Sequence, residues 1–214
     1  MRTVRWLATA IAFAALTPAV ASAQEGRLFK DAWFWGAKAG VMSFSNGFDR
    51  HAAPLVGIEW LITRTKGGLY ISGEQLWFDE QTALVDNNGN GFTVDMKNMK
   101  RVTVSALAFP VSYGTLRPYA GVGFAVNWIS NAMVVEPFQD QTQQHDIWGQ
   151  IDDRRDQATF LLMGGVQAQY RRFSVFGQAV LQPRSSGFLL GGKAAYVLEG
   201  GIRLNLGSSR DNGL

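Results

Sequence analysis

The sequence contains no cysteine among its 214 residues. The chain therefore forms no disulfide and holds no metal on thiolates. Charged residues make up only 17% of the chain, whereas about a quarter is usual for a soluble domain. The formal net charge is only +3, and no basic cluster is interleaved with aromatic residues, so a nucleic-acid partner is not predicted.

Long apolar runs are also lacking after the first residues, so no transmembrane helix is predicted. Residues 1–23 begin with Arg2 and Arg5, continue through the apolar run 6–16, and end on the small residues 21–23. This is the pattern of a cleavable secretory signal peptide. A membrane anchor, the alternative, needs about 18 or more apolar residues. We expect a mature chain that starts at Gln24, forms one domain over residues 24–206, and ends in a short tail, 207–214.

The mature sequence alternates polar and apolar residues with a period of two, which is typical of β-strands. Eight strands are predicted, and no helix is: 31–44, 54–63, 68–79, 98–110, 117–130, 157–170, 172–182 and 193–206. Their connections alternate between short turns and long loops, as in outer-membrane barrels. The sequence therefore predicts an all-β protein, an eight-stranded antiparallel up-and-down transmembrane β-barrel.

Period two alone does not separate a membrane barrel from a soluble lipocalin-like barrel, which has its apolar face inside. Here the polar face consists mainly of small residues with a few charges that balance, and buried charges need such pairing. The predicted lumen charge network comprises Lys38, Glu59, Glu74, Arg101, Lys193, Glu199 and Arg203. Strand 68–79 fits least well, because Gln75 falls on the apolar face. The balance of charge favours the membrane barrel.

Bulky aromatic residues end several strands on the apolar face. Aromatic side chains of this kind form a girdle at the two interfaces of a membrane. The predicted girdle comprises Trp33, Trp60, Trp77, Trp128 and Tyr196. This second feature also favours a barrel whose apolar face contacts lipid.

Three segments resemble the OmpA/OmpX-like eight-stranded outer-membrane barrel family: "WFWGAKAGVMSF", "RPYAGVGFAVNW" and "EGGIRLNL". In the last, Glu199, Gly201, Leu204 and Leu206 resemble the terminal-strand signal that the barrel assembly machinery reads. The family usually ends on Phe or Trp, whereas this strand ends on Leu206. The resemblance implies a monomer in the bacterial outer membrane, with outer-membrane lipid and, during biogenesis, the assembly machinery as its partners.

No catalytic, cofactor-binding or metal-binding residue is predicted. His51 and His145 fall in predicted loops without suitable partners, so an enzyme is not expected. The segment "DNNGNG" (86–91) offers oxygen ligands for calcium, although an Asn-Gly turn explains it more simply. "DDRRD" (152–156) is interpreted as a self-paired loop segment.

Two functions remain open. The first is a structural or interaction protein that displays extracellular loops of unknown ligand. The second is a small pore or carrier for small solutes. We favour the first, because side chains just fill the interior of an eight-stranded barrel.

Overall fold

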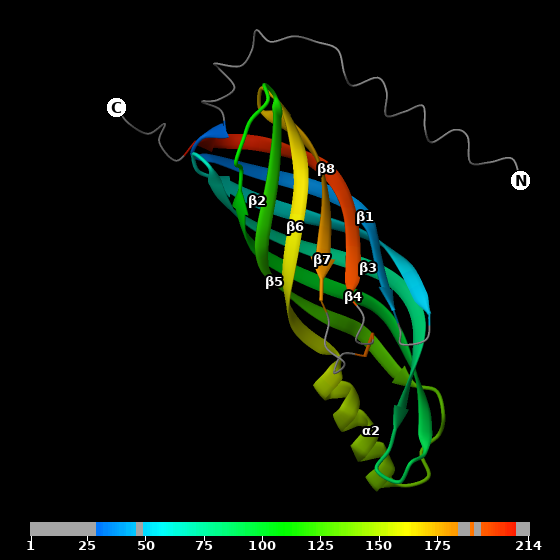
Figure 1. Cartoon of the computed structure of the whole chain (residues 1–214). Helices are drawn as coiled ribbons and strands as arrows, with labels where there is room; N and C mark the ends of the chain where they lie inside the picture. The colour runs from blue at the N-terminus through cyan, green and yellow to red at the C-terminus, as the bar shows by residue number, and fades with distance from the viewer. Residues whose placement is uncertain (1–28, 46–48, 184–188, 191–193, 209–214) are drawn as a thin grey trace, which may run out of the picture.

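Eight antiparallel strands close into one barrel in the computed structural model, with β8 returning to pair with β1 (Figure 1). The structure describes residues 29–45, 49–183, 189–190 and 194–208, so the predicted signal peptide and Lys193 lie outside it. The strands are β1 (Ala32–Ser45), β2 (Arg50–Thr63), β3 (Gly67–Val85), β4 (Gly91–Ala108), β5 (Leu116–Val134), β6 (Asp156–Tyr170), β7 (Phe173–Gln182) and β8 (Ala195–Ser208). The predicted fold class is confirmed.

The strands are joined alternately at the two ends of the barrel (Figure 1). The turns β2–β3, β4–β5 and β6–β7 lie at one end, here called the turn end. Strands β1, β3, β5 and β7 run toward the other end, here called the crown end. The predicted alternation of short and long connections is only partly present, because β3 and β4 extend into the predicted long loop and leave 86–90 between them, whereas 109–115 separates β4 from β5.

Strands β3, β4 and β5 run beyond their predicted ends and project past the rest of the barrel. A β-bulge breaks the β3–β4 register between Leu76 and Asp79, opposite Asn98, which has a φ of 61°. On β4 the bulge changes which side chains face inward: Arg101 is buried on the turn side of it, and Met96 and Val94 on the crown side. The alternation of inward and outward side chains along β4 shifts by one residue at Asn98. The sequence pattern therefore predicted that the strand starts there.

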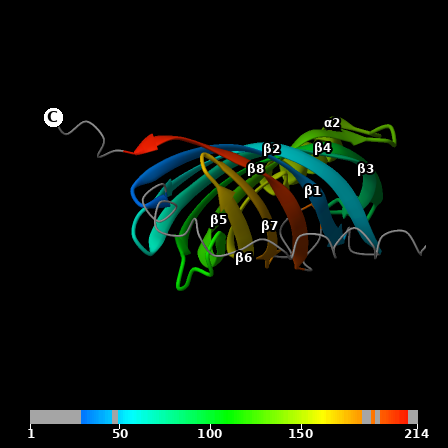
Figure 2. The same cartoon turned by 90° about the horizontal axis from the view of Figure 1, so that it is seen from above.

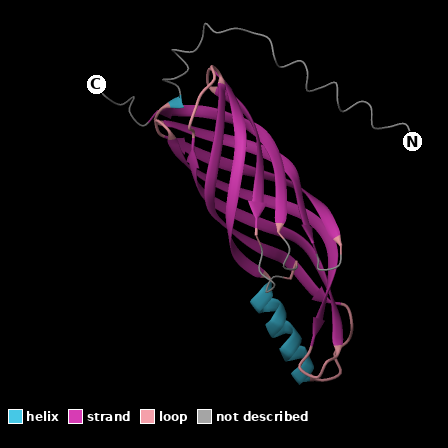
Figure 3. Cartoon of the chain, in the orientation of Figure 1, coloured by secondary structure: helices cyan, strands magenta, loops and turns pink. Residues whose placement is uncertain are grey.

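A helix, α2 (Gln141–Arg154), lies between β5 and β6, so the expectation of no helix is wrong (Figure 3). Asp140 caps it by accepting a hydrogen bond from the Gln143 backbone N–H at 2.8 Å. Ile147 and Ile151, one turn apart, are buried. An N-cap aspartate and apolar residues four apart are helix signals that a search for period two misses.

The helix contacts the outer end of β3, and in the view from above it lies on the side of the barrel where β3 and β4 lie (Figure 2). The segment "DDRRD" forms its last residues and the start of β6 rather than a loop, although Arg155 does contact Asp152 at 3.4 Å. No helix in the described part of the chain has the length and apolar character needed to cross a bilayer.

The outer face of the barrel is apolar and the inner face carries the charges. On β8, Leu198 and Leu204 are exposed whereas Glu199, Arg203 and Asn205 are buried. A soluble barrel has the reverse arrangement. The exposed apolar side chains of the strands form an apolar belt around the whole barrel. Such a surface needs lipid to cover it, so the arrangement is that of a membrane barrel.

Contact between the belt and lipid can be tested at Val122, which is 50% exposed. This residue lies on β5, midway between the turn end of the strand and Trp128. We expect Val122→Lys to lower the free energy of unfolding in lipid vesicles by about 2–4 kcal/mol, because it places a charge near the bilayer midplane. The matched control is Met133→Lys on the same strand, beyond the bulge and 67% exposed, which should leave that free energy unchanged. Equal urea midpoints for Val122→Lys and the wild type would show that this face does not contact lipid.

Candidate functional site: the lumen network and the crown

Six of the seven predicted lumen residues meet at the centre of the barrel, and the seventh, Lys193, lies outside the described residues. They come from five neighbouring strands: Lys38 from β1, Glu59 from β2, Glu74 from β3, Arg101 from β4, and Glu199 and Arg203 from β8. All six are almost fully buried. The set contains equal numbers of cations and carboxylates, so its formal charge is zero.

Glycines beside these charges make room for them. Gly57 pairs in register with both Lys38 and Glu74, and a Cβ atom on it would lie 2.7 Å from the Glu74 Cγ. Gly36 lies between Glu59 and Arg203 in the same way. The small residues on the inner face therefore leave the volume that long charged side chains occupy.

Lys38 is the centre of the larger cluster. Its Nζ lies 2.6 Å from Glu74 Oε1 and 2.9 Å from Glu199 Oε2. Arg101 forms an ion pair with Glu74, and its Nη2 lies 3.9 Å from Glu199. Each carboxylate thus faces two cations, which offsets the cost of removing these charges from water.

Arg203 and Glu59 form a second buried ion pair. Arg203 Nη1 also donates a hydrogen bond to Gln167 Oε1 at 2.7 Å. The guanidinium lies over the Phe176 ring, 3.8 Å from its centroid, in a cation–π contact.

Three neutral side chains join the two groups of ion pairs. The Tyr70 hydroxyl accepts from Lys38 Nζ at 2.7 Å and donates to Glu59 Oε2 at 3.0 Å. Gln178 Nε2 donates to Glu199 Oε1 at 2.7 Å, and Tyr119 donates to Gln178 Oε1 at 2.6 Å. The sequence analysis did not single out these three residues; their only signal was their place on the inward face of their strands. We call them, with the six charged residues, the lumen network.

Apolar side chains fill the barrel on both sides of the lumen network, so the lumen is less polar than predicted. Phe34 and Leu61 are buried toward the turn end, and Met42, Leu55 and Leu76 toward the crown end. The physical reason is the small bore of eight strands, which is packed like a protein core. Charged groups enclosed in this way can pair and hold the strands together.

The extended ends of β3, β4 and β5 build a compact structure with α2 at the crown end. We call residues 79–97 and 131–154, which include α2, the crown. Its inward side chains are apolar: Leu84, Phe92 and Val94 are buried, as are Ile147 and Ile151 of α2. Gln150 Nε2 donates to the Val85 carbonyl at 3.1 Å, and Asp146 Oδ2 accepts from the Asn87 N–H at 2.9 Å. The helix is therefore fixed to the β3–β4 hairpin.

The segment "DNNGNG" forms the tip of that hairpin, with Gly89 at a φ of 88°. Asp86 uses its carboxylate within the crown: it accepts from the N–H groups of Asn88 and Asn90 at 2.9 and 2.7 Å, and from Gln143 Nε2 at 3.0 Å. No group of three or more potential metal ligands occurs among the residues that the structure describes. The tip is therefore organised by its own hydrogen bonds.

The two histidines lie in regular elements, not in loops as expected. His51 belongs to β2, and its Nδ1 lies 2.6 Å from Glu80 Oε1. His145 lies on the exposed side of α2. The two histidines lie on separate elements.

The predicted girdle residues lie in two groups on the outer face. Trp33 and Trp60 lie toward the turn end, where Trp60 also stacks on Trp35 with 5.7 Å between ring centroids. Trp77, Trp128 and Tyr196 are exposed toward the crown end.

Of the predicted assembly signal, Leu204 and Leu206 point outward, Glu199 points into the lumen, and Gly201 pairs with Lys38. Its role in assembly stays a prediction.

No protein-family model matches the sequence, and no curated protein does. The fold is similar to the crystal structure of Neisserial surface protein A (NspA), with a TM-score of 0.54 and 10% identity over 81% of this chain and 97% of that one. A weaker likeness, with a TM-score of 0.44 and 11% identity over 82% and 97%, is to Ail, the attachment invasion locus protein of Yersinia pestis. At sequence identities this low, the similarity to these structures shows the fold alone.

The chain has the fold of an eight-stranded outer-membrane β-barrel. The predicted resemblance is confirmed at that level. The apolar belt is the surface that such a barrel presents to the lipid of the outer membrane.

The lumen network generates one prediction. We expect Glu59→Ala to lower the free energy of unfolding in lipid vesicles by about 3–5 kcal/mol, because it leaves Arg203 buried without its carboxylate. Asp153→Ala, which removes an exposed charge of α2, is the matched control and should leave the urea midpoint unchanged. If the two variants unfold at the same midpoint, the buried pair does not stabilise the barrel.

The crown generates a second prediction, on pH. Hydrogen bonds from Gln143 and Asn90 lower the pKa of the Asp86 carboxyl from its ordinary 3.8 to about 2. Since this pKa is lowered by folding, the stabilisation is complete above about pH 4 and is lost as the pH falls through about 2. The backbone amide proton shifts of Asn88 and Asn90 should titrate with a midpoint near 2, and Asp86→Asn should abolish the titration. A midpoint near 3.8 would mean that the carboxylate is not held by these donors.

Proposed function

We propose that the protein is a structural and interaction protein of the outer membrane, in which a closed barrel anchors the crown and displays it outside the cell. The observation that carries this proposal is the lumen network. Its charges are paired, buried, and packed between apolar layers, so the barrel interior serves to hold the strands together rather than to pass solutes.

The crown has the properties of a display surface. Its apolar core and its hydrogen bonds between α2 and the β3–β4 hairpin hold its outer side chains in fixed positions. These include the exposed Met133 and Trp148, whose types are common at the centres of protein interfaces. A surface ordered before binding loses less conformational entropy when a partner binds.

The charge of the crown narrows the class of partner. Carboxylates outnumber cationic side chains in its two segments, and several, including Asp152 and Asp153, are exposed. An acidic surface attracts partners with basic surfaces and speeds their association at low salt.

We also propose that the protein has no catalytic role, because its two histidines lie on separate elements and His51 is engaged with Glu80.

Single-channel recording in a planar bilayer tests the closed barrel. We expect wild-type protein to show no steady conductance under conditions in which a porin, reconstituted in the same way, conducts. Steady ohmic conductance of the wild type would mean a water-filled lumen, and the pore or carrier function would then replace the one proposed here.

A further inference from the structure

One position on the outer face of the barrel departs from the apolar belt. Lys100 of β4 is exposed there, directly between Gln75 of β3 and Trp128 of β5 in the register of the sheet. Gln75 is the residue that fitted the apolar face least well in the sequence pattern. The two polar side chains are therefore neighbours, and they form one polar spot in a lipid-facing surface.

A hollow adjoins this spot on its turn side. The next row of the sheet is Ile58, Gly73 and Val102, and a Cβ atom on Gly73 would meet no atom within 4 Å. The resulting groove has a volume of about 720 Å³ and is lined by apolar side chains, with Lys100 and Gln75 at one side. Lys38, Glu74 and Arg101 also border it, but their side chains are buried on the inner face. We call it the Gly73 groove.

The height of Lys100 on the barrel places its ammonium near the headgroups of one leaflet. Lys100 precedes the turn end of β4, Ala108, by eight residues. With a rise of about 3.3 Å per residue and a strand tilt of about 40°, this is about 20 Å along the barrel axis. The apolar band of such barrels is about 25 Å tall, and a lysine stem can extend its charge several ångströms further.

Lys100 has no carboxylate partner within the described parts of the chain. Lys97, on the crown side of the bulge, lies 3.0 Å from Asp79 Oδ2. An unpaired cation at the edge of the hydrocarbon is costly, and an anion from outside the chain is its complement. A phosphate accepts charge-assisted hydrogen bonds from an ammonium.

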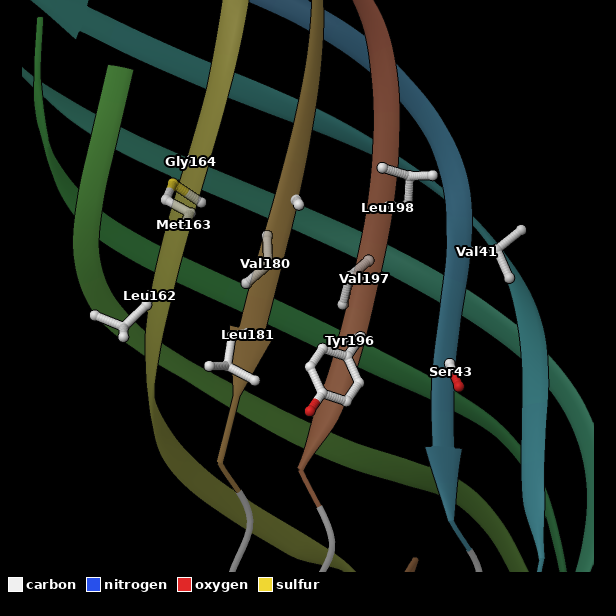
Figure 4. A pocket seen from close by; sticks show the side chains of 11 residues that line it. Val41, Ser43, Leu162, Met163, Gly164, Val180, Leu181, Tyr196, Val197 and Leu198 are labelled. Carbon is white, nitrogen blue, oxygen red and sulfur yellow. The ribbon is translucent and has the colours of Figure 1, made fainter. Parts of the chain in front are cut away.

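A second groove, on the other side of the barrel, provides the comparison. It has a volume of about 560 Å³ and is bordered by Val41, Leu162, Leu181 and Leu198, with Gly164 among its lining residues (Figure 4). No cationic side chain lines it. This groove accommodates an apolar chain but offers nothing to a charged headgroup.

We propose that the Gly73 groove is a binding site for a phosphorylated lipid of the crown-end leaflet. The headgroup phosphate contacts the Lys100 ammonium beside Gln75 and Trp128, and an acyl chain occupies the hollow over Gly73. The site is independent of the closed lumen and of the crown.

Native mass spectrometry of the full barrel, released from nanodiscs of phosphatidylcholine with a minor fraction of bisphosphorylated lipid A, tests the proposal. The readout is the ratio of retained lipid A to retained phosphatidylcholine. We expect the wild type to enrich lipid A, and Lys100→Gln to lower the ratio about five- to tenfold. Lys100→Gln removes a charge from the belt, so it does not endanger folding.

Gly73→Leu fills the hollow and should also lower the ratio, whereas the matched variant Gly164→Leu, in the groove of Figure 4, should leave it unchanged. Excess inorganic phosphate should not displace the lipid, because the hollow holds its acyl chain. The proposal is overturned if wild type retains both lipids equally, if Lys100→Gln matches wild type, or if free phosphate removes the lipid.

Discussion

The pairing of charges at the centre of the barrel is the interaction on which the rest of the structure depends. Lys38, Glu74, Arg101 and Glu199 share their charges, and Glu59 pairs with Arg203. These residues come from five strands, so the network fixes the stagger of the strands as well as their inward faces. It also dictates where glycine occurs, since Gly36 and Gly57 lie where a Cβ atom would collide with Glu59 and Glu74. Because the charged side chains of these strands point inward and pair with one another there, the outer face can consist mainly of apolar side chains.

The second constraint is the change of solvent along the strands. On the turn side of Asn98, lipid lies outside, so the outward side chains are apolar and the charged ones face inward. On the crown side, water lies outside, and the inward side chains Phe92, Val94 and Met96 form an apolar core. The bulge at Asn98 marks this transition on β4. The closed barrel and the ordered crown therefore follow from one chain that meets two solvents.

Much of this could be read from the sequence, and the limits have physical causes. Period two showed the eight strands and which residues share a face, because a strand's side chains alternate strictly. It could not show that Lys38 pairs with Glu74 and Glu199, since the stagger between strands is not local information. The extensions of β3, β4 and β5 were missed because alternation breaks at Asn98. Helix α2 was missed although Asp140 and the spacing of Ile147 and Ile151 indicated it. Tyr70 and Gln178 carried no charge to attract attention, yet they connect the network.

The most direct test of the central claim is the exchange of the side-chain Nε protons of Arg101 and Arg203, followed by NMR in lipid nanodiscs after transfer to deuterated water. Both protons donate to buried carboxylates, to Glu74 and to Glu59 respectively. The account predicts that both signals persist long after those of the exposed Arg154 and Arg155 have vanished, and that they show through-space contacts to their carboxylate partners' side chains. Loss of the Arg101 and Arg203 signals as fast as those of the exposed arginines would show a solvated lumen and would contradict the account.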